Sequence, residues 1–242
     1  MRLALISDIH GNLTALQAVF ADIDQQDVDA VHCLGDIIGY GPEPTACLEL
    51  VTRRCKVKLL GNHEYVVMGL ESTEQMNRVA RKAAEWTISQ LGEREISMLA
   101  DFDMEHRFDR YMLVHASPHE PESWHYVLTI AEARKAFAAM ETDLCFVGHT
   151  HIPMVFRCED DGTIRQQDGH DFTAQNDMKY LVNIGSVGQP RDDDPRSSYV
   201  LLDTESAAVR FRRVEYDVTA TQEKMVEVDM PRMLIDRLAV GR

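Results

Sequence analysis

Short apolar runs alternate with helical patterns over the first quarter of the chain. Residues 2–6 and 28–34 are apolar enough to form buried strands, and residues 56–60 are a third run of this kind. Apolar positions recur with helical spacing from Leu13 to Ile23, and residues 44–53 have the character of a second helix. The order strand, helix, strand, helix, strand predicts right-handed crossovers and a largely parallel sheet.

The pattern changes twice farther along the chain. Residues 74–99 are mostly helical with a break near Gly92, and we expect the segment 74–100 to be a cap near the functional site. Strands are predicted at 111–114 and 144–147, with a helix over 130–140 between them. From 154 to 211, short strands separated by turn signals predict a second sheet packed on the first. The sequence has no repeat and no linker, so we predict one domain over 1–242.

Polar motifs directly follow five of the predicted strands. Functional loops follow the carboxyl ends of strands in parallel sheets, so we expect these motifs to meet in one site. Glycine adjoins three of the five motifs, where it lets the backbone turn sharply and leaves room for ions and phosphate. The motifs are Asp8-Ile9-His10, Gly35-Asp36, Gly61-Asn62-His63-Glu64, Val114-His115-Ala116 and Gly148-His149-Thr150-His151.

The residue types in these motifs suit divalent transition metals. Aspartate and neutral histidine are ligands for Mn, Fe, Ni and Zn. A closed structural zinc site needs about four ligands, commonly cysteines, whereas the motifs contain seven candidate ligands and no cysteine. The charges of two carboxylates do not cancel those of two divalent ions, which leaves a positive pocket that suits a phosphate anion. In two-metal hydrolases the two metal ions lie roughly 3.5–4 Å apart. A lone motif of this kind is a weak signal, whereas the combination is a strong one.

Composition limits the partners and the compartment. The formal charge of −15 disfavours nucleic acid polymers and anionic membranes, but bound metals can reverse the sign locally for a small phosphorylated substrate. Five scattered cysteines without a CxxC pair indicate free thiols in a reducing compartment. The sequence contains no membrane-length apolar run and no signal peptide, so we expect a cytoplasmic protein. A homo-oligomer is compatible with the sequence, which contains no clear interface signal.

The five motifs together resemble the calcineurin-like metallophosphoesterase superfamily, whose pattern is DxH, GD, GNHE/D, a later His and GHxH. Residues 7–12, 35–42 and 185–191 resemble a bacterial and archaeal branch with small phosphodiesterases and diadenosine tetraphosphatase-like enzymes. The similarity extends to Asp236-Arg237-Leu238 near the end of the chain. This resemblance implies an α/β fold, a four-layer α-β-β-α sandwich of two mixed sheets flanked by helices.

The resemblance also implies a site for two divalent ions, with Mn expected for activity. One ion would be held by Asp8, His10 and His151, and the other by Asn62, His115 and His149. Asp36 would bridge the two ions, and a hydroxide shared between them would attack phosphorus. His63, as an imidazolium, would neutralise phosphate charge and protonate the leaving oxygen, while Glu64 would orient or support it.

One departure from the superfamily pattern bears on the substrate. Protein serine/threonine phosphatases carry Asp-Arg three and four residues after the GD aspartate, where this chain has Gly39 and Tyr40. The loss of that arginine argues against a protein phosphatase. Arg191 is the candidate replacement for the phosphate contact, and the alternative is a salt bridge to one of residues 192–194.

The resulting expectation is a metal-dependent phosphoesterase for a small, nucleotide-like phosphodiester, phosphomonoester or dinucleoside polyphosphate. Asn12 would contact substrate or be an ordinary helix N-cap, and Tyr40 would stack on a base or line its loop. Substrate selection is expected in residues 40–44, 65–77 and 117–126. The alternative is a non-catalytic metal-binding scaffold of the same fold, which is less favoured because every ligand of the motif set is retained.

Overall fold

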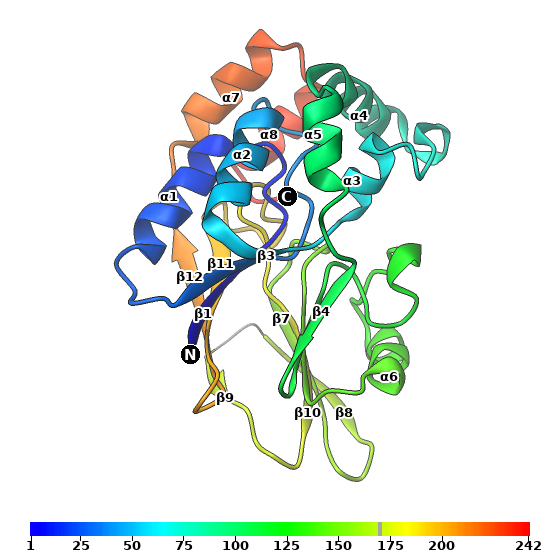
Figure 1. Cartoon of the computed structure of the whole chain (residues 1–242), viewed down its shortest axis with the longest axis vertical. Helices are drawn as coiled ribbons and strands as arrows, with labels where there is room; N and C mark the ends of the chain where they lie inside the picture. Colours follow the sequence, from blue (N-terminus) through cyan, green and yellow to red (C-terminus); the bar gives the residue numbers. More distant parts are fainter. Residues whose placement is uncertain (169–170) are drawn as a thin grey trace.

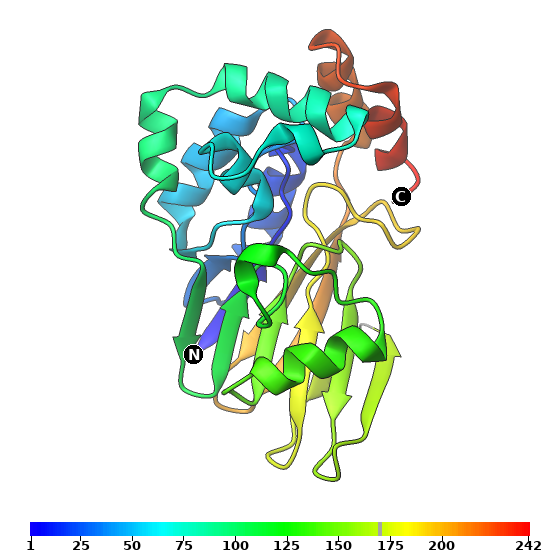
Figure 2. The same cartoon turned by 90° about the vertical axis from the view of Figure 1, so that its right-hand side faces the viewer.

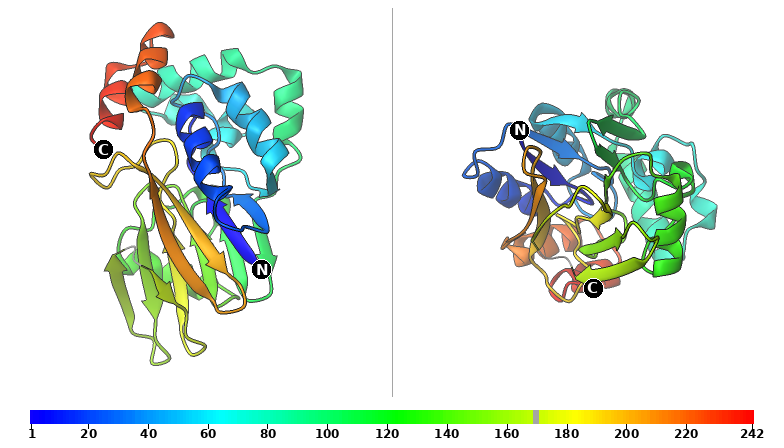
Figure 3. Two further views of the ribbon diagram at one scale, coloured as in Figure 1. Left: turned by 90° about the vertical axis from the view of Figure 1, so that its left-hand side faces the viewer. Right: turned by 90° about the horizontal axis from the view of Figure 1, so that it is seen from below.

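The computed structural model describes residues 1–168 and 171–242, and its architecture is two six-stranded sheets packed face to face (Figure 1). The first sheet has the order β3-β2-β1-β11-β12-β9 and the second the order β4-β5-β6-β10-β7-β8. In the left view of Figure 3, the orange strands of the first sheet lie in front of the green and yellow strands of the second. Each sheet combines parallel and antiparallel pairs, so both are mixed.

The strands are short and have these bounds. The first sheet contains β1 (Arg2–Ile6), β2 (Ala30–Cys33), β3 (Cys55–Lys58), β9 (Phe172–Thr173), β11 (Ser197–Asp203) and β12 (Ala208–Val214). The second contains β4 (Glu105–Phe108), β5 (Tyr111–Val114), β6 (Leu144–Val147), β7 (Met154–Cys158), β8 (Ile164–Asp168) and β10 (Lys179–Asn183). The central strands β1, β2, β5, β6 and β10 are almost wholly buried, as their apolar runs predict.

The helices cover the outer faces of the sheets and one end of the molecule (Figure 2). They are α1 (Leu13–Ile23), α2 (Pro44–Arg54), α3 (Asn62–Val67), α4 (Arg78–Gln90), α5 (Glu93–Leu99), α6 (Ile130–Ala139), α7 (Val218–Glu227) and α8 (Arg232–Leu238). Side chains of α1 and α2 pack on one face of β1 and β2, and α6 packs on the outer face of the second sheet. The expected α-β-β-α sandwich is therefore confirmed.

The alternation of side chains along β1 explains the layers. Ala4 and Ile6 point toward the helices, whereas Leu3 and Leu5 point into the core between the sheets. Leu113, which belongs to the second sheet, lies in that same inner core. Strand β1 thus contributes to two apolar layers, which leaves its carboxyl end and the loop beyond it as the place for polar chemistry.

Helices α4 and α5 form the predicted helical segment, and they are separated at Gly92, the N-cap of α5. Figure 2 shows these two helices at the same end of the molecule as α7 and α8. Ala83 of α4 packs with Met225 of α7 and Leu234 of α8. The assignment of 1–242 to one domain, with this segment as a cap, stays a prediction. No helix in the described ranges has the length and apolar character needed to cross a bilayer.

Candidate metal centre

The ligand-bearing loops follow the strands with an unusual backbone conformation. Asp8, His10, Asp36, His149 and His151 have φ angles of 54°, 49°, 51°, 66° and 62°, in the left-handed region that residues with side chains rarely adopt. Such a conformation costs about 1–3 kcal/mol at each residue and persists where the surrounding structure fixes it. Five of the seven predicted ligands share it, and other residues with this conformation are scattered along the chain, so the ligand loops form the densest group of strained residues, as at functional sites.

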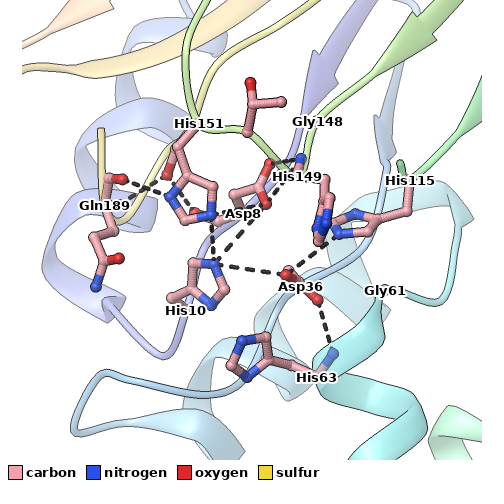
Figure 4. A network of polar contacts seen from close by, with 12 residues as sticks. Asp8, His10, Asp36, Gly61, His63, His115, Gly148, His149, His151 and Gln189 are labelled. Carbon is pink, nitrogen blue, oxygen red and sulfur yellow. Dashed lines mark hydrogen bonds and ion pairs between the residues drawn. The ribbon is translucent and has the colours of Figure 1, made fainter. Parts of the chain in front are cut away.

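Six of the predicted ligands converge in two groups of buried side chains (Figure 4). Within each group the ligand atoms lie within 4.8 Å of one another. Asp36 belongs to both groups, and its Oδ2 atom is 3.7 Å from His10 Nε2 and 3.3 Å from His115 Nε2. The first group is Asp8, His10, Asp36 and His151, and the second is Asp36, His115 and His149.

The orientation of three histidine rings is set by backbone carbonyls. Because a carbonyl oxygen only accepts hydrogen bonds, each ring must carry a proton on Nδ1, which leaves Nε2 as the nitrogen that faces the cluster. His10 and His151 then place two Nε2 atoms 3.0 Å apart, an arrangement that needs a proton or a cation between them. The Nδ1 bonds are His10 to Ile38 O (3.2 Å), His115 to Leu34 O (2.8 Å) and His151 to Gln189 O (2.6 Å).

Three buried atoms of predicted ligands test whether a metal fits. Asn62 Oδ1, His115 Nε2 and His149 Nε2 have no hydrogen-bond partner within the described part of the chain. An unpaired buried polar atom costs about 1–3 kcal/mol. Coordination of a divalent cation satisfies such atoms, so the residues present fit a metal, while the place of Asn62 beside His115 and His149 stays a prediction.

The electrostatics of the cluster centre on an ionised Asp36. Burial raises the pKa of Asp36, but the neighbouring His115 and His63 outweigh this and bring the pKa well below its usual value. Burial lowers the pKa of His115, but the Asp36 carboxylate more than reverses this and raises the pKa to about 9. Burial and the His115 charge lower the pKa of His149 to about 3. An ionised carboxylate and neutral imidazoles are the forms that bind metal, and a cation would replace the proton that His115 holds here.

Two glycines make room for the ligand carboxylates. A Cβ atom on Gly61 would overlap Asp36 Oδ1, and one on Gly148 would overlap Ser7 Oγ and Asp8 Oδ2. The backbone N–H of His149 also donates to Asp8 Oδ2 at 3.0 Å. The close approach of these loops to the carboxylates therefore requires glycine at both positions.

Glu64 ties the loop after β2 to the loop after β3. Its carboxylate is fully buried and accepts backbone N–H bonds from Asp36 (2.8 Å), Ile37 (2.9 Å), Ile38 (3.2 Å) and Gly61 (2.8 Å). Burial, with the Asp36 charge, raises its pKa to about 7. These bonds place Glu64 behind Asp36, so its contacts are those of a positioning residue rather than of a partner of the His63 ring.

His63 stands at the start of α3, beside the first ligand group. Its backbone N–H donates to Asp36 Oδ1 at 3.0 Å, and its ring centroid is 4.8 Å from that of His10 and 4.4 Å from that of Tyr40. A Cβ atom on Gly39 would overlap the His63 ring. The glycine that stands here in place of the phosphatase aspartate is therefore needed to make room for the ring. Burial lowers the pKa of His63 although the Asp36 charge opposes this, so the charge of a bound anion would favour the imidazolium form.

The side chain of Asn12 is engaged in structural hydrogen bonds. Its Oδ1 accepts from Ala15 N at 3.1 Å, as an N-cap of α1, and from Thr221 Oγ1 at 3.0 Å. Its Nδ2 donates to Gly188 O at 2.9 Å. The N-cap interpretation is therefore confirmed, while a substrate contact by Asn12 stays a prediction.

Arg191 lies over the ring of Tyr40. Its Cζ is 6.0 Å from the Tyr40 centroid, and its Nε and Nη2 donate to Gln189 Oε1 at 3.3 and 2.8 Å. Among the described residues, none of the three aspartates that follow it forms an ion pair with it. They pair instead with other arginines: Asp192 with Arg213, Asp193 with Arg242 and Asp194 with Arg196.

Sequence reasoning missed two neighbours of the ligands. Tyr126 was included only within the range 117–126, and its ring stacks on His149 at 4.2 Å between centroids. Gln189 orients His151 through its backbone carbonyl, a contact that leaves no mark in side-chain chemistry. An aromatic residue in a loop after a ligand was the one available signal for Tyr126.

Comparisons with known proteins agree with this geometry. The calcineurin-like phosphoesterase superfamily domain matches residues 1–207. An uncharacterized protein of Methanocaldococcus jannaschii is 36% identical over 244 residues, which cover 99% of this chain and 98% of that protein. The crystal structure of a metallophosphoesterase from Sphaerobacter thermophilus is 40% identical with a TM-score of 0.88, over 100% of this chain and 99% of that chain. A Pyrococcus horikoshii protein, 18% identical with a TM-score of 0.81 over 100% and 98% of the two chains, shares the fold. The chain therefore belongs to the calcineurin-like phosphoesterase superfamily and is a phosphoric ester hydrolase.

Proposed function

We propose that this chain is a dinuclear metal-dependent phosphoesterase. The observation that carries the proposal is the shared carboxylate of Asp36, which belongs to two adjacent groups of buried ligands. One ion would be held by Asp8, His10 and His151, the other by Asn62, His115 and His149, with Asp36 between them. The mixed aspartate and histidine set suits Mn, Fe, Ni or Zn, and we propose Mn for activity.

The residues around the ligands have separate roles in this proposal. Bound divalent ions would lower the pKa of a water molecule and polarise the phosphoryl oxygens. His63, held between Tyr40 and His10, would stabilise phosphate charge and protonate the leaving oxygen. Glu64 would hold the Asp36 loop in place, and Arg191 would contact phosphate.

The proposed substrate is small and nucleotide-like. It is a phosphodiester, a phosphomonoester or a dinucleoside polyphosphate, in line with the branch that the motifs resemble. Tyr126, which is 48% exposed and stacked on His149, offers an aromatic face beside the second ligand group. Tyr40 lines the opposite group through its contact with His10, so a base has an aromatic neighbour on either side of the centre.

The test is an assay of metal-stripped protein before and after reconstitution with Mn. Bis-p-nitrophenyl phosphate, p-nitrophenyl phosphate and diadenosine tetraphosphate are offered side by side. We expect turnover that disappears with chelator and returns with Mn, and the preferred substrate identifies the subclass. Two bound Mn per chain without turnover of any of the three would favour the non-catalytic scaffold instead.

A further inference from the structure

The C-terminal helix α8 brings a second arginine to the metal centre. Arg237 Nη1 donates to Gln189 Oε1 at 3.2 Å, the same oxygen that accepts from Arg191 Nη2 at 2.8 Å. Gln189 is only 2% exposed, and its backbone carbonyl accepts from Nδ1 of the candidate ligand His151. One buried residue therefore orients a ligand and also gathers two guanidinium groups.

No acidic side chain in the described part of the chain pairs with these two guanidinium groups. Among residues 1–168 and 171–242, no aspartate or glutamate lies within 4.0 Å of either group, although the chain has 40 acidic residues against 25 basic ones. The remaining contact of Arg237 is from Nε to the main-chain oxygen of Arg242. Arg232, one turn earlier in α8, shows the usual arrangement, an ion pair with Asp236. Burial and the charge of Arg191 lower the pKa of Arg237. A neutral amide oxygen does not balance two cations that repel each other, whereas an anion does.

The arginine pair lies beside the reacting centre, on the side of Tyr40. Arg191 lies over the Tyr40 ring, which is 4.7 Å from the His10 ring and 4.4 Å from the His63 ring between centroids. An anion on the pair would therefore be a near neighbour of a phosphate on the metals.

Helix α8 lies outside the part of the chain that the superfamily domain covers. That match ends at residue 207, before α7 and α8 begin. The two helices pack on α4 through Met225 and Leu234. Arg237 is thus supplied by an addition to the common domain, which is where a residue for substrate choice is expected rather than one for the shared chemistry.

We propose that Arg191 and Arg237 form an anion subsite that binds a second, non-reacting phosphate group of the substrate. The idea rests on the proposed function, because the reacting phosphate is the one at the metals. Gln189 holds the two planar donor groups together before binding, which reduces the entropy cost of capturing a phosphate. Substrates with two or more phosphates should then bind more tightly than esters with a single phosphate.

Calorimetry with two probes that have no bond to hydrolyse tests the subsite. Methylenediphosphonate has two phosphonate groups and methylphosphonate has one, and each is titrated into Mn-reconstituted protein. The variants are Arg237→Gln, which removes the charge, and Arg237→Lys, which keeps the charge but loses the planar pair of N–H donors of the guanidinium group. Arg232→Gln is the matched control, because it removes the same charge from the exposed face of the same helix.

We expect Arg237→Gln to weaken methylenediphosphonate binding about 10- to 100-fold, the range for a lost hydrogen bond to a charged group. Methylphosphonate binding should be unchanged, Arg237→Lys should be intermediate, and Arg232→Gln should match the wild type. Equal losses for both probes, or no loss for either, would overturn the subsite. If Arg237→Gln does not fold, the affinities of Arg237→Lys for the two phosphonates are compared instead, and a loss for methylenediphosphonate alone supports the subsite. Turnover of bis-p-nitrophenyl phosphate by the wild-type preparation reports separately on the proposed hydrolysis.

Discussion

The ligand cluster and the arginine rim are built in different ways, although they share Gln189. Cluster side chains such as Asp8 and His115 are fully buried and are oriented by backbone groups of loops that follow strands. The rim consists of Arg191, Arg237 and the aromatic rings beside them, which are partly exposed and meet through side-chain contacts. The difference supports our proposal that the loops after the strands hold the metals, while segments later in the chain adjust the choice of substrate.

Backbone strain is found in most of the cluster and in part of the rim. Five of the predicted ligands and Tyr40 of the rim have left-handed backbone, whereas Arg191 and Arg237 are in ordinary conformations. Strain of this kind is retained where exact placement matters. Substitutions in the cluster should therefore act on metal binding and on the rate, and substitutions in the rim should act on affinity for the substrate.

Asp36→Asn should have the largest effect, because it weakens the one ligand that both groups share. We expect the variant to retain less than the full metal complement and to lose roughly 10³-fold or more in turnover, since a bound ion contributes several kcal/mol. Elemental analysis together with an assay of bis-p-nitrophenyl phosphate measures both quantities. Full metal content with wild-type turnover would show that Asp36 is not an essential ligand shared by the two ions.

His63→Asn separates proton transfer from metal binding within the cluster. The ring of His63 is not one of the candidate ligands, so metal content should be normal while turnover falls about 10²- to 10⁴-fold, the range for a lost general acid. The loss should be smaller for an aryl ester with a good leaving group than for diadenosine tetraphosphate. Unchanged activity on both substrates would exclude His63 from the mechanism.

Gly148→Ala tests whether the close approach of the loops is required. The added Cβ must displace Ser7 or Asp8, so we expect metal affinity to fall about 10- to 100-fold, as when an orienting contact is lost. The free energy of unfolding should also fall by about 1–3 kcal/mol, because the added methyl group overpacks the site. Gly92→Ala is the control, because its Cβ would lie 3.3 Å from the flexible end of Glu95. Equal metal affinity for the two variants would argue against a rigid cluster.

Arg191→Ala should have the smallest of these effects and should leave the metal content intact. If Arg191 contacts phosphate, the Michaelis constant rises about tenfold or more while kcat changes less, because a charged hydrogen bond is lost from substrate binding. Steady-state kinetics on the preferred substrate measures this. An unchanged Michaelis constant would assign Arg191 a structural role beside Tyr40.

Much of the cluster is predictable because two simple rules act together. Apolar runs such as 2–6 and 144–147 have to be buried, and the first polar residues after them must then lie at the ends of the strands. The seven candidate ligands follow from those positions and from the resemblance. The N-cap interpretation of Asn12 needed only the start of a helical pattern.

The rim was less predictable because its contacts connect distant segments. The bond from Arg237 to Gln189 spans 48 positions of the chain, and nothing in either local sequence indicates the other. The short helix α3 begins at the metal motif itself, and the edge strand β4 is only partly buried, so neither has a clear apolar period. The bonds of Glu64 to four backbone amides were likewise hidden, because backbone donors are the same at every residue.

The most direct test of the two-metal centre is a titration of metal-stripped protein with Mn that follows bound metal and turnover of bis-p-nitrophenyl phosphate in the same samples. We predict that two Mn bind per chain and that turnover rises only as the second is bound, because Asp36 joins both groups of ligands. Full turnover with one Mn per chain, or turnover that persists in the presence of chelator, would contradict the dinuclear mechanism.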